Sequence, residues 1–247
     1  TTAPLPGIGR TIQVTRDPGL ELDPALSPDG TMLAYAQGTP TRMQIYVQQV
    51  GGGRRVTLTS DSTDSFRSPK WSPDGTQLAF QGNDGIFVAP SLGGPLRRVV
   101  RIDTLALSNV TGLGLGAFTP LSGIAWSPDG QRLAYADFLN AILVVPVAGG
   151  PSVRLARVPL PASPAWSPDG SRLAGSSGNS NFSFGTGYLG NVGYSSIWLV
   201  PVNGSEAGTP VSMSGLPFAR CRKRITGNSP VAWRGAMRAA SSRLRKS

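Results

Sequence analysis

Four aspartates recur in one short motif, Ser-Pro-Asp-Gly, at positions 29, 74, 129 and 169. Carboxylates placed in pairs can exchange protons with a substrate or hold a cation. These four are separated by 45, 55 and 40 residues. Ser, Pro and Gly at these positions are typical of a tight turn, in which Asp can bond its own backbone. We therefore assign Asp29, Asp74, Asp129 and Asp169 a structural role in repeated turns.

Nucleophiles and metal ligands are scarce in this sequence. It has no histidine and one cysteine, Cys221. This composition excludes His-ligated metals, Ser-His-Asp or Cys-His catalysis and an internal disulfide within the chain. Arg220 and Arg222 could lower the pKa of the Cys221 thiol, but no neighbouring base accompanies it, which favours an incidental thiol. We predict a protein that is not an enzyme and has no cofactor and no metal.

A literal Gly-x-Gly-x-x-Gly occurs at residues 185–190. In a dinucleotide site this motif follows a strand and opens a helix, whose N-terminus holds the pyrophosphate. Here it lies in an insertion rich in Gly, Ser and Asn that runs into a predicted strand. The motif therefore does not predict nucleotide binding.

The net charge of +10 is concentrated at the C-terminal end. Residues 1–219 hold 14 basic and 13 acidic residues, whereas residues 220–247 hold nine basic residues and no acid. Such a tail could neutralise phosphates, but a solvated basic end is commoner, so nucleic acid is not a predicted partner. No apolar stretch approaches the roughly 20 residues that span a bilayer. The chain starts at Thr1 without a signal sequence, which suggests a segment cut from a longer precursor.

Around the motif, a larger unit repeats four times. Each copy has an anchor residue, the turn, a short apolar strand, a second strand and a small-residue turn, with anchors at Leu26, Trp71, Trp126 and Trp166. The spacing is close to the period of a four-stranded propeller blade. A blade of this size buries too little apolar surface to fold alone, so the blades must stack, with the tryptophans between them. The predicted fold is all-β: a β-propeller of four-stranded antiparallel blades, incomplete, with about four full blades plus a fragment of a normally six-bladed ring.

The repeated W-S-P-D-G-x-x-L-A-[YF] pattern, followed by I-[YFW]-V and a Gly-Gly turn, resembles the TolB-like, WD-repeat-like β-propellers of bacteria over residues 11–214. More narrowly, residues 19–30 with 33–36 resemble the start of the propeller in some bacterial receptor-type serine/threonine kinases. No kinase motif is present in this chain. The resemblance implies a binding or scaffold module of the bacterial envelope, in a periplasmic or extracytoplasmic location.

We divide the chain into a linker (residues 1–10), an incomplete propeller (11–219) and a basic tail or disrupted final blade (220–247). Residues 229–233 read like the opening of another blade, after which the pattern stops. A shifted or truncated reading frame and a genuine tail both explain this. Residues 11–15 look like the outer strand that would complete the last blade. Unpaired strand edges of an open propeller favour association, so dimerisation is possible.

Candidate ligand-binding residues follow from the geometry of a propeller. Asp23, Ser68, Gly123 and Ser163 each stand three residues before an anchor, which predicts a place near the channel mouth. Eight of the nine acids outside the repeated turns map to the same face, which predicts a mildly acidic surface for a cationic peptide or a metal ion, although solvated polar loops are the commoner explanation of such acids. The leading function is non-catalytic recognition of a protein, peptide or small ligand. The narrower resemblance implies that this module is the sensory domain of a membrane-associated bacterial serine/threonine kinase. The alternatives are a propeller that gates substrates for a prolyl-oligopeptidase-like hydrolase encoded outside this segment, and a stand-alone envelope propeller.

Overall fold

A computed structural model describes most of the repeat region. The described residues are 11, 13–15, 17–59, 64–102, 121–137, 141–158, 161–177, 183–184, 187–188, 196–202 and 209–211. The chain divides into two units, residues 1–212 and 213–247. The second unit, and with it the predicted basic tail and Cys221, lies outside the described residues, as does the linker at 1–10.

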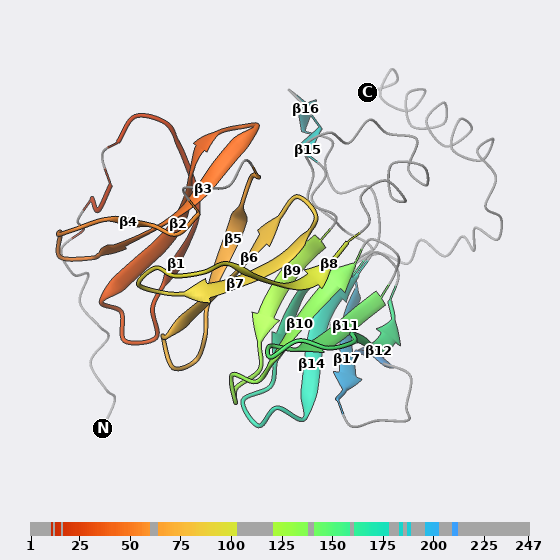
Figure 1. The fold of residues 1–247 in the computed structure, drawn as a ribbon. Coiled ribbons are helices and arrows are strands. Elements are labelled where there is room, and N and C mark those ends of the chain that lie inside the picture. Colours follow the sequence, from red (N-terminus) through yellow and green to blue (C-terminus); the bar gives the residue numbers. More distant parts are fainter. Residues whose placement is uncertain are drawn as a thin grey trace, which may run out of the picture. The chain divides into compact units, whose positions relative to one another are not determined.

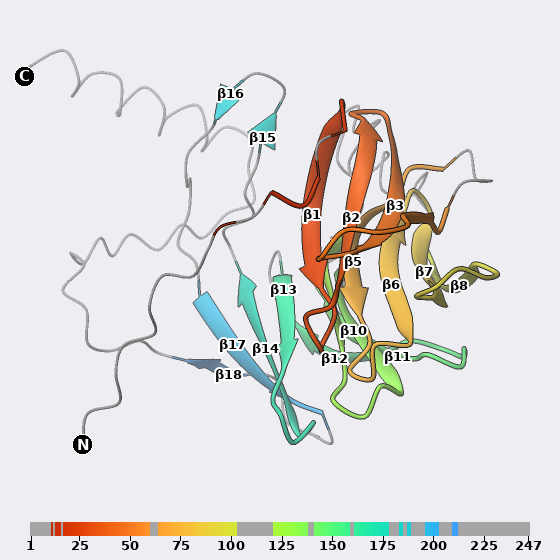
Figure 2. The same cartoon turned by 90° about the vertical axis from the view of Figure 1, so that its left-hand side faces the viewer.

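Four antiparallel sheets of four strands each account for the described fold (Figure 1). Blade 1 consists of β1 (Leu20–Leu26), β2 (Met32–Thr39), β3 (Arg42–Gln49) and β4 (Val56–Thr57). Blade 2 consists of β5 (Arg67–Trp71), β6 (Gln77–Gly82), β7 (Gly85–Pro90) and β8 (Arg97–Arg101). Blade 3 consists of β9 (Leu121–Trp126), β10 (Arg132–Asp137), β11 (Ala141–Pro146) and β12 (Val153–Arg157). Blade 4 consists of β13 (Pro161–Trp166), β14 (Arg172–Ser177), β17 (Ser196–Pro201) and β18 (Thr209–Val211), which lie side by side in Figure 2.

The all-β propeller prediction is confirmed by these sheets. Within each blade the strands pair in chain order, and the long insertion in blade 4 carries a two-stranded hairpin, β15 (Ser183–Phe184) and β16 (Gly187–Tyr188). Of the residues described, none belongs to a helix long and apolar enough to cross a membrane.

Each Ser-Pro-Asp-Gly turn is closed by its own side chains. In blade 1 the Gly30 N–H donates to the Ser27 carbonyl at 2.9 Å, and Gly30 has a φ of 72°, which a glycine adopts without strain. The Asp29 carboxylate accepts bonds from the Ser27 hydroxyl and from the Thr31 N–H (3.1 Å). The other three turns repeat this arrangement. The motif therefore joins the first two strands of every blade in one fixed geometry.

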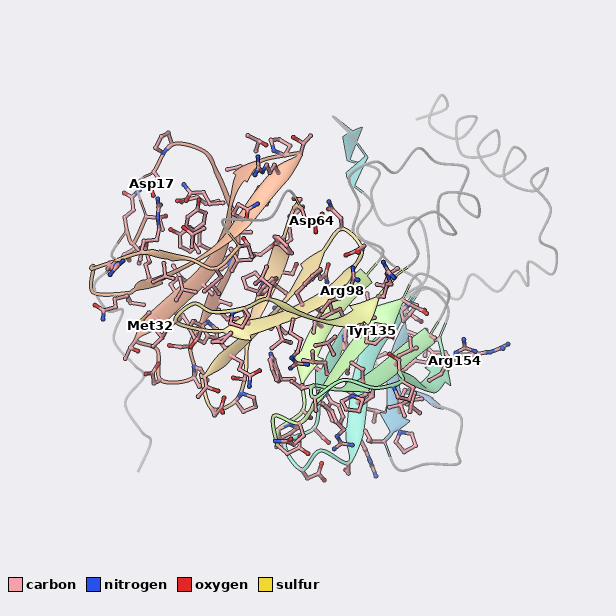
Figure 3. The ribbon with its side chains drawn as sticks, viewed as in Figure 1. Asp17, Met32, Asp64, Arg98, Tyr135 and Arg154 are labelled. Atoms are coloured by element: carbon pink, nitrogen blue, oxygen red, sulfur yellow. The ribbon has the colours of Figure 1, made fainter. Side chains whose placement is uncertain are left out.

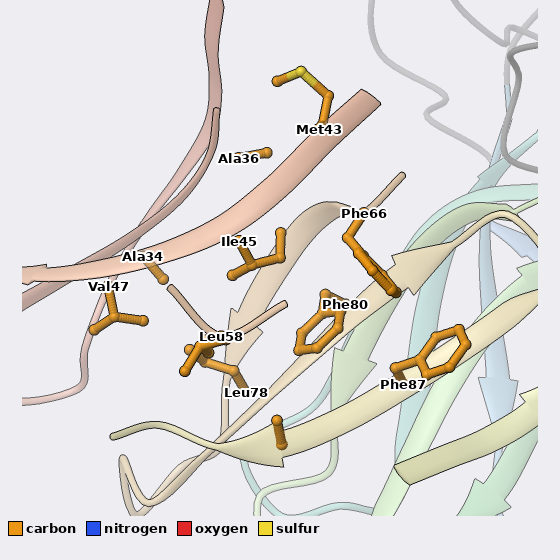
Figure 4. Close-up of a cluster of buried hydrophobic side chains, with 11 residues drawn as sticks. Ala34, Ala36, Met43, Ile45, Val47, Leu58, Phe66, Leu78, Phe80 and Phe87 are labelled. Carbon is orange, nitrogen blue, oxygen red and sulfur yellow. The ribbon is translucent and has the colours of Figure 1, made fainter. Parts of the chain in front are cut away.

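Apolar clusters between consecutive blades form the core. Figure 4 shows the cluster between blades 1 and 2, in which Phe66, Phe80 and Phe87 meet Ile45 and Leu58. A second cluster joins blades 2 and 3, and a third joins blades 3 and 4. Because each sheet is covered by its neighbour, a blade obtains a dry face that its own strands cannot supply.

The anchor tryptophans fasten each blade to the one before it. The Trp71 indole N–H donates to the Ala25 carbonyl at 2.9 Å, and Trp126 donates to the Lys70 carbonyl at 2.9 Å. Trp166 repeats the contact with the Ala125 carbonyl at 3.2 Å. Blade 1 has Leu26 at this position, which is 60% exposed. It therefore lacks the indole that would bond a preceding blade.

The N-terminal segment contacts the face of blade 1 that points away from blade 2. The Val14 carbonyl accepts a bond from the Gln48 side chain at 3.0 Å, and the Thr15 hydroxyl donates to Glu21 at 2.5 Å. Burial raises the pKa of Tyr35 to about 12, so its hydroxyl stays protonated and donates to Gln48. Residues 11 and 13–15 carry no strand, so the predicted outer strand is absent from this described part of the segment.

Candidate functional site

The four candidate residues share an unusual backbone conformation. Asp23 and Ser68 have a φ of 55°, Ser163 has a φ of 50° and Gly123 has a φ of 137°. Asp23, Ser68 and Ser163 are the only non-glycine residues with a positive φ among the described residues. The register of the first strand shifts around each of the four, which marks a β-bulge. We call Asp23, Ser68, Gly123 and Ser163 the bulge row.

The bulge row lies on the first strand of each blade. These strands, β1, β5, β9 and β13, are paired on one side only, and β1 contacts β5, β5 contacts β9 and β9 contacts β13. The structure therefore places the candidate residues on neighbouring strands, in the middle of the strands rather than in their end loops. Their position relative to a channel mouth is not tested by this placement and stays a prediction.

A direct link joins the first two members of the row. The Asp23 carboxylate accepts bonds from the Ser68 N–H at 3.0 Å and from the Ser68 hydroxyl at 3.4 Å. It also accepts a bond from the Arg67 Nε at 3.3 Å, which forms an ion pair. One carboxylate of blade 1 thus satisfies the irregular backbone of the blade 2 bulge.

Gly123 and Ser163 approach each other through their backbones. A Cβ at position 123 would lie 3.2 Å from the Ser163 nitrogen and 3.0 Å from Pro164 Cδ. The contact between neighbouring blades therefore differs along the bulge row. At Asp23 it is a hydrogen bond to an acidic side chain, and at Gly123 it is close packing of two backbones. Ser163 itself is exposed.

Ion pairs offset part of the predicted acidic surface. Asp17 pairs with Arg55, Asp23 with Arg67 and Asp84 with Arg98. Asp61 and Asp103 lie outside the described residues. Paired charges attract a distant cation less than isolated carboxylates do, so the described acids make a weaker field than their number suggests.

The four aspartates of the repeated turns are not gathered at one site, although Asp29 and Asp74 of neighbouring turns line the same pocket. The proline of each turn lies against the glycine of the turn in the next blade. A Cβ on that glycine would lie 3.6 Å from the proline Cδ at Gly75, and 3.8 Å from it at Gly130 and at Gly170. Hydrogen bonds from the Ser hydroxyl of the turn, followed by bonds from the residue after the turn, lower the pKa of Asp29 and Asp169 to about 2. No group of three or more His, Cys, Asp or Glu among the described residues could hold a metal ion.

The offset of three residues from the anchor predicted the members of the bulge row but not the hydrogen bonds between blades. One further signal was present in the sequence. Asp, Ser and Gly tolerate positive φ or compensate for it by local bonding, and three of the four row members precede a proline. A residue that tolerates a positive φ, placed three residues before the anchor of every blade, indicates a repeated bulge.

Comparison with known proteins supports the β-propeller fold. The profile described as the dipeptidyl peptidase IV (DPP IV) N-terminal region matches residues 62–141. A protein TolB homolog of Chlorobium luteolum is 30% identical over 132 residues, which cover 52% of this chain and 26% of that protein. An uncharacterized peptidase YuxL of Bacillus subtilis is 29% identical over 122 residues, covering 45% of this chain and 16% of that protein.

Among solved structures, a putative TolB from Agrobacterium tumefaciens superposes with a TM-score of 0.57 at 22% identity. The superposition covers 81% of this chain and 65% of that one. The fold of the chain is therefore a β-propeller like that of TolB. It matches about a quarter of the length of the TolB homologues with which its sequence aligns.

Proposed function

We propose that the chain is a non-catalytic binding module that recognises a protein or peptide at the bulge row. The bond that the Ser68 N–H donates to the Asp23 carboxylate, within a row of positive-φ residues, is the observation that carries this proposal. Strained backbone persists where the surrounding structure holds it and is concentrated at binding sites. The resemblance to TolB-like propellers supports a place in the bacterial envelope, in a periplasmic or extracytoplasmic location.

The mechanism is rigid presentation of a surface. Blades packed by their apolar clusters hold the first strands in place, so a ligand meets a preformed set of backbone and side-chain groups. A preformed surface loses little conformational entropy on binding. The chain contributes no proton transfer and no covalent step in this mechanism.

Peptide display against the full chain tests the proposal. Peptides selected on the wild-type chain are then measured against Ser163→Arg, which places a long cation on an exposed row member. We expect at least a tenfold loss of affinity, because residues near the centre of an interface carry most of the binding energy. Val153→Arg is the matched control, because Val153 is 57% exposed on the outermost strand of blade 3. Equal loss in both variants, or no loss in Ser163→Arg, contradicts binding at the row.

A second candidate function is supported by the peptidase relatives. The match to the dipeptidyl peptidase IV N-terminal region and the similarity to YuxL favour a propeller that gates substrates for a hydrolase encoded outside this segment. The coding sequence around this segment distinguishes three possibilities. A hydrolase domain supports the substrate-gating propeller, a kinase domain supports the sensory domain, and a secretion signal supports the stand-alone envelope propeller. Association through the outer strand edges stays a prediction that light scattering of the purified chain tests.

A further inference from the structure

A surface pocket of about 430 Å³ lies between the first two Ser-Pro-Asp-Gly turns. Met32 and Trp71 line it, together with Asp29, Asp74 and Leu92. Met32 is the first residue of β2, directly after the turn (Figure 3). None of the bulge row residues lines this pocket. It is therefore separate from the site proposed above.

The interface between blades 3 and 4 shows what occupies the corresponding position there. The Arg132 guanidinium carbon lies 4.9 Å from the centroid of the Trp166 ring. The same guanidinium donates from Nη2 to Asp129 at 3.4 Å. A cation over an indole face and beside a carboxylate is stabilised by both groups. The chain thus contains its own example of an arginine site built from a turn aspartate and an anchor tryptophan.

The repeat places the pocket residues in register with that example. Asp29 corresponds to Asp129, and Trp71 corresponds to Trp166, the anchor of the following blade. Both indoles are oriented by the same bond to a carbonyl of the preceding blade. Met32, six residues after its anchor, stands where Arg132 stands in blade 3. The pocket between blades 1 and 2 therefore has the tryptophan and the carboxylate without the cation.

Charge in the pocket is one-sided. Its described lining includes two carboxylates and no Lys or Arg. Bonds from the turn serine lower the pKa of both Asp29 and Asp74, so both are ionised at neutral pH. Each carboxylate accepts bonds from the serine and the threonine of its turn. In the equivalent turn of blade 3, Asp129 accepts the Arg132 guanidinium in addition to bonds from Ser127 and Gln131.

We propose that this turn-end pocket binds an arginine side chain of a partner peptide, with the guanidinium over Trp71 as Arg132 lies over Trp166. Asp29 and Asp74 accept its N–H groups, and Met32 packs against its aliphatic stem. Leu92, which is 74% exposed at the rim, contacts an apolar neighbour of the arginine in the same peptide.

Titration of the full chain with the tripeptide acetyl-Leu-Arg-Leu-amide, followed by NMR of the indole N–H groups, tests the proposal. The matched probe replaces Arg by citrulline, which keeps the shape and removes the charge. We expect the arginine peptide to shift the Trp71 indole signal with a Kd near the millimolar range, and the citrulline peptide to bind about tenfold more weakly. Equal affinities for the two probes overturn the proposal.

Two variants complete the test. Met32→Arg supplies the missing guanidinium from the chain itself and should abolish binding of the arginine peptide. Arg132→Met removes the guanidinium from Trp166 and should create a further site, so that the stoichiometry rises by one. Unchanged binding by Met32→Arg, or a stoichiometry that does not rise in a folded Arg132→Met, contradicts the proposal. Neither result affects binding at the bulge row, because the two sites share no residue.

Discussion

Asp23 and Asp29 are six residues apart, and their carboxylates stabilise different parts of the structure. Asp29 bonds within its own turn, to Ser27 and Thr31. Asp23 bonds across the interface to Ser68 of the next blade. Replacement of Asp29 therefore affects a local turn, whereas replacement of Asp23 affects the contact between two blades.

Asp23→Ala should lower the free energy of unfolding by about 1–2 kcal/mol. The change removes a charge-assisted acceptor from Ser68 and Arg67, and the partial exposure of this ion pair reduces the effect. Asp23→Asn should cost less, since Asn keeps an acceptor and tolerates a positive φ. Urea unfolding measures both. Ser163→Ala, at the equivalent and exposed position of blade 4, is the control and should change stability by less than about 0.5 kcal/mol. A similar loss in the control contradicts the role of the bond.

The turn aspartates make stability depend on acid pH. Asp29 and Asp169 have a pKa of about 2 in the folded chain against 3.8 for the free group. The unfolded chain therefore takes up protons first as the pH falls. The stabilisation is fully present above about pH 4 and is lost as the pH falls through about 2. Urea unfolding at pH 5 and at pH 2 should show this difference.

Removal of the turn hydroxyls should weaken that pH dependence. Ser27→Ala with Ser167→Ala removes the largest cause of the lowered pKa at Asp29 and at Asp169. The double variant should lose stability at pH 5 and change less than wild type between pH 5 and pH 2. Ser91→Ala is the control, because this hydroxyl donates to the Gly75 carbonyl and to no carboxylate. An equally steep pH dependence in the double variant argues against the assignment.

Among the strands and turns, the sequence predicted the elements better than their contacts. Pro at a turn corner and alternating apolar residues act locally, so the four blades and their Ser-Pro-Asp-Gly turns followed from pattern alone. The bulge at Asp23 and the bond from Trp71 to Ala25 depend on the position of a neighbouring sheet. Such contacts join residues about 45 apart in the chain. No local pattern specifies these contacts. The offset of three residues from the anchor therefore predicted the members of the bulge row but not the hydrogen bonds that join the blades.

Trp126→Phe tests the fastening of one blade to the next. Phenylalanine keeps most of the ring but loses the indole N–H that bonds the Lys70 carbonyl at 2.9 Å. We expect a loss of about 1 kcal/mol in the free energy of unfolding, the usual net value of one hydrogen bond. Trp198→Phe is a useful comparison, because its indole N–H bonds Ser177 within the same blade. If neither variant differs from wild type in thermal unfolding, the indole bond does not fasten the blades.

The close approach of β8 to β7 limits side-chain size at Gly85. A Cβ there would lie 1.9 Å from the Val100 carbonyl oxygen, so the backbone of β7 or β8 would have to move. Gly85→Ala should therefore destabilise the chain by about 3 kcal/mol. Gly51→Ala, where a Cβ would meet nothing within 4 Å, should change stability by less than about 0.5 kcal/mol. Guanidinium unfolding of both variants distinguishes close backbone packing from a general effect of adding a methyl group.

Across the described part of the chain, stability depends on the interfaces between blades, and these differ in composition. Between blades 1 and 2, Phe66 packs edge-on against Phe80 and Phe87. The ring centroids are 5.5 Å apart for Phe66 and Phe80, and 5.3 Å apart for Phe66 and Phe87. Between blades 3 and 4, blade 4 contributes the buried side chains of Leu173 and Val200. The first interface therefore buries large aromatic side chains where the third buries smaller aliphatic ones.

Hydrogen exchange followed by mass spectrometry should show this difference between the interfaces. Local opening is easiest where few apolar contacts must break, so the amides of β14 and β17 should exchange faster than those of β6 and β7. Ile142→Ala, at a fully buried position of the third cluster, should speed exchange in blade 4 and leave blade 1 unchanged. Phe80→Ala should do the reverse, because it opens the first cluster. Equal acceleration of all blades by either variant would mean that the sheets open together, and that packing between neighbours does not divide the propeller into units of separate stability.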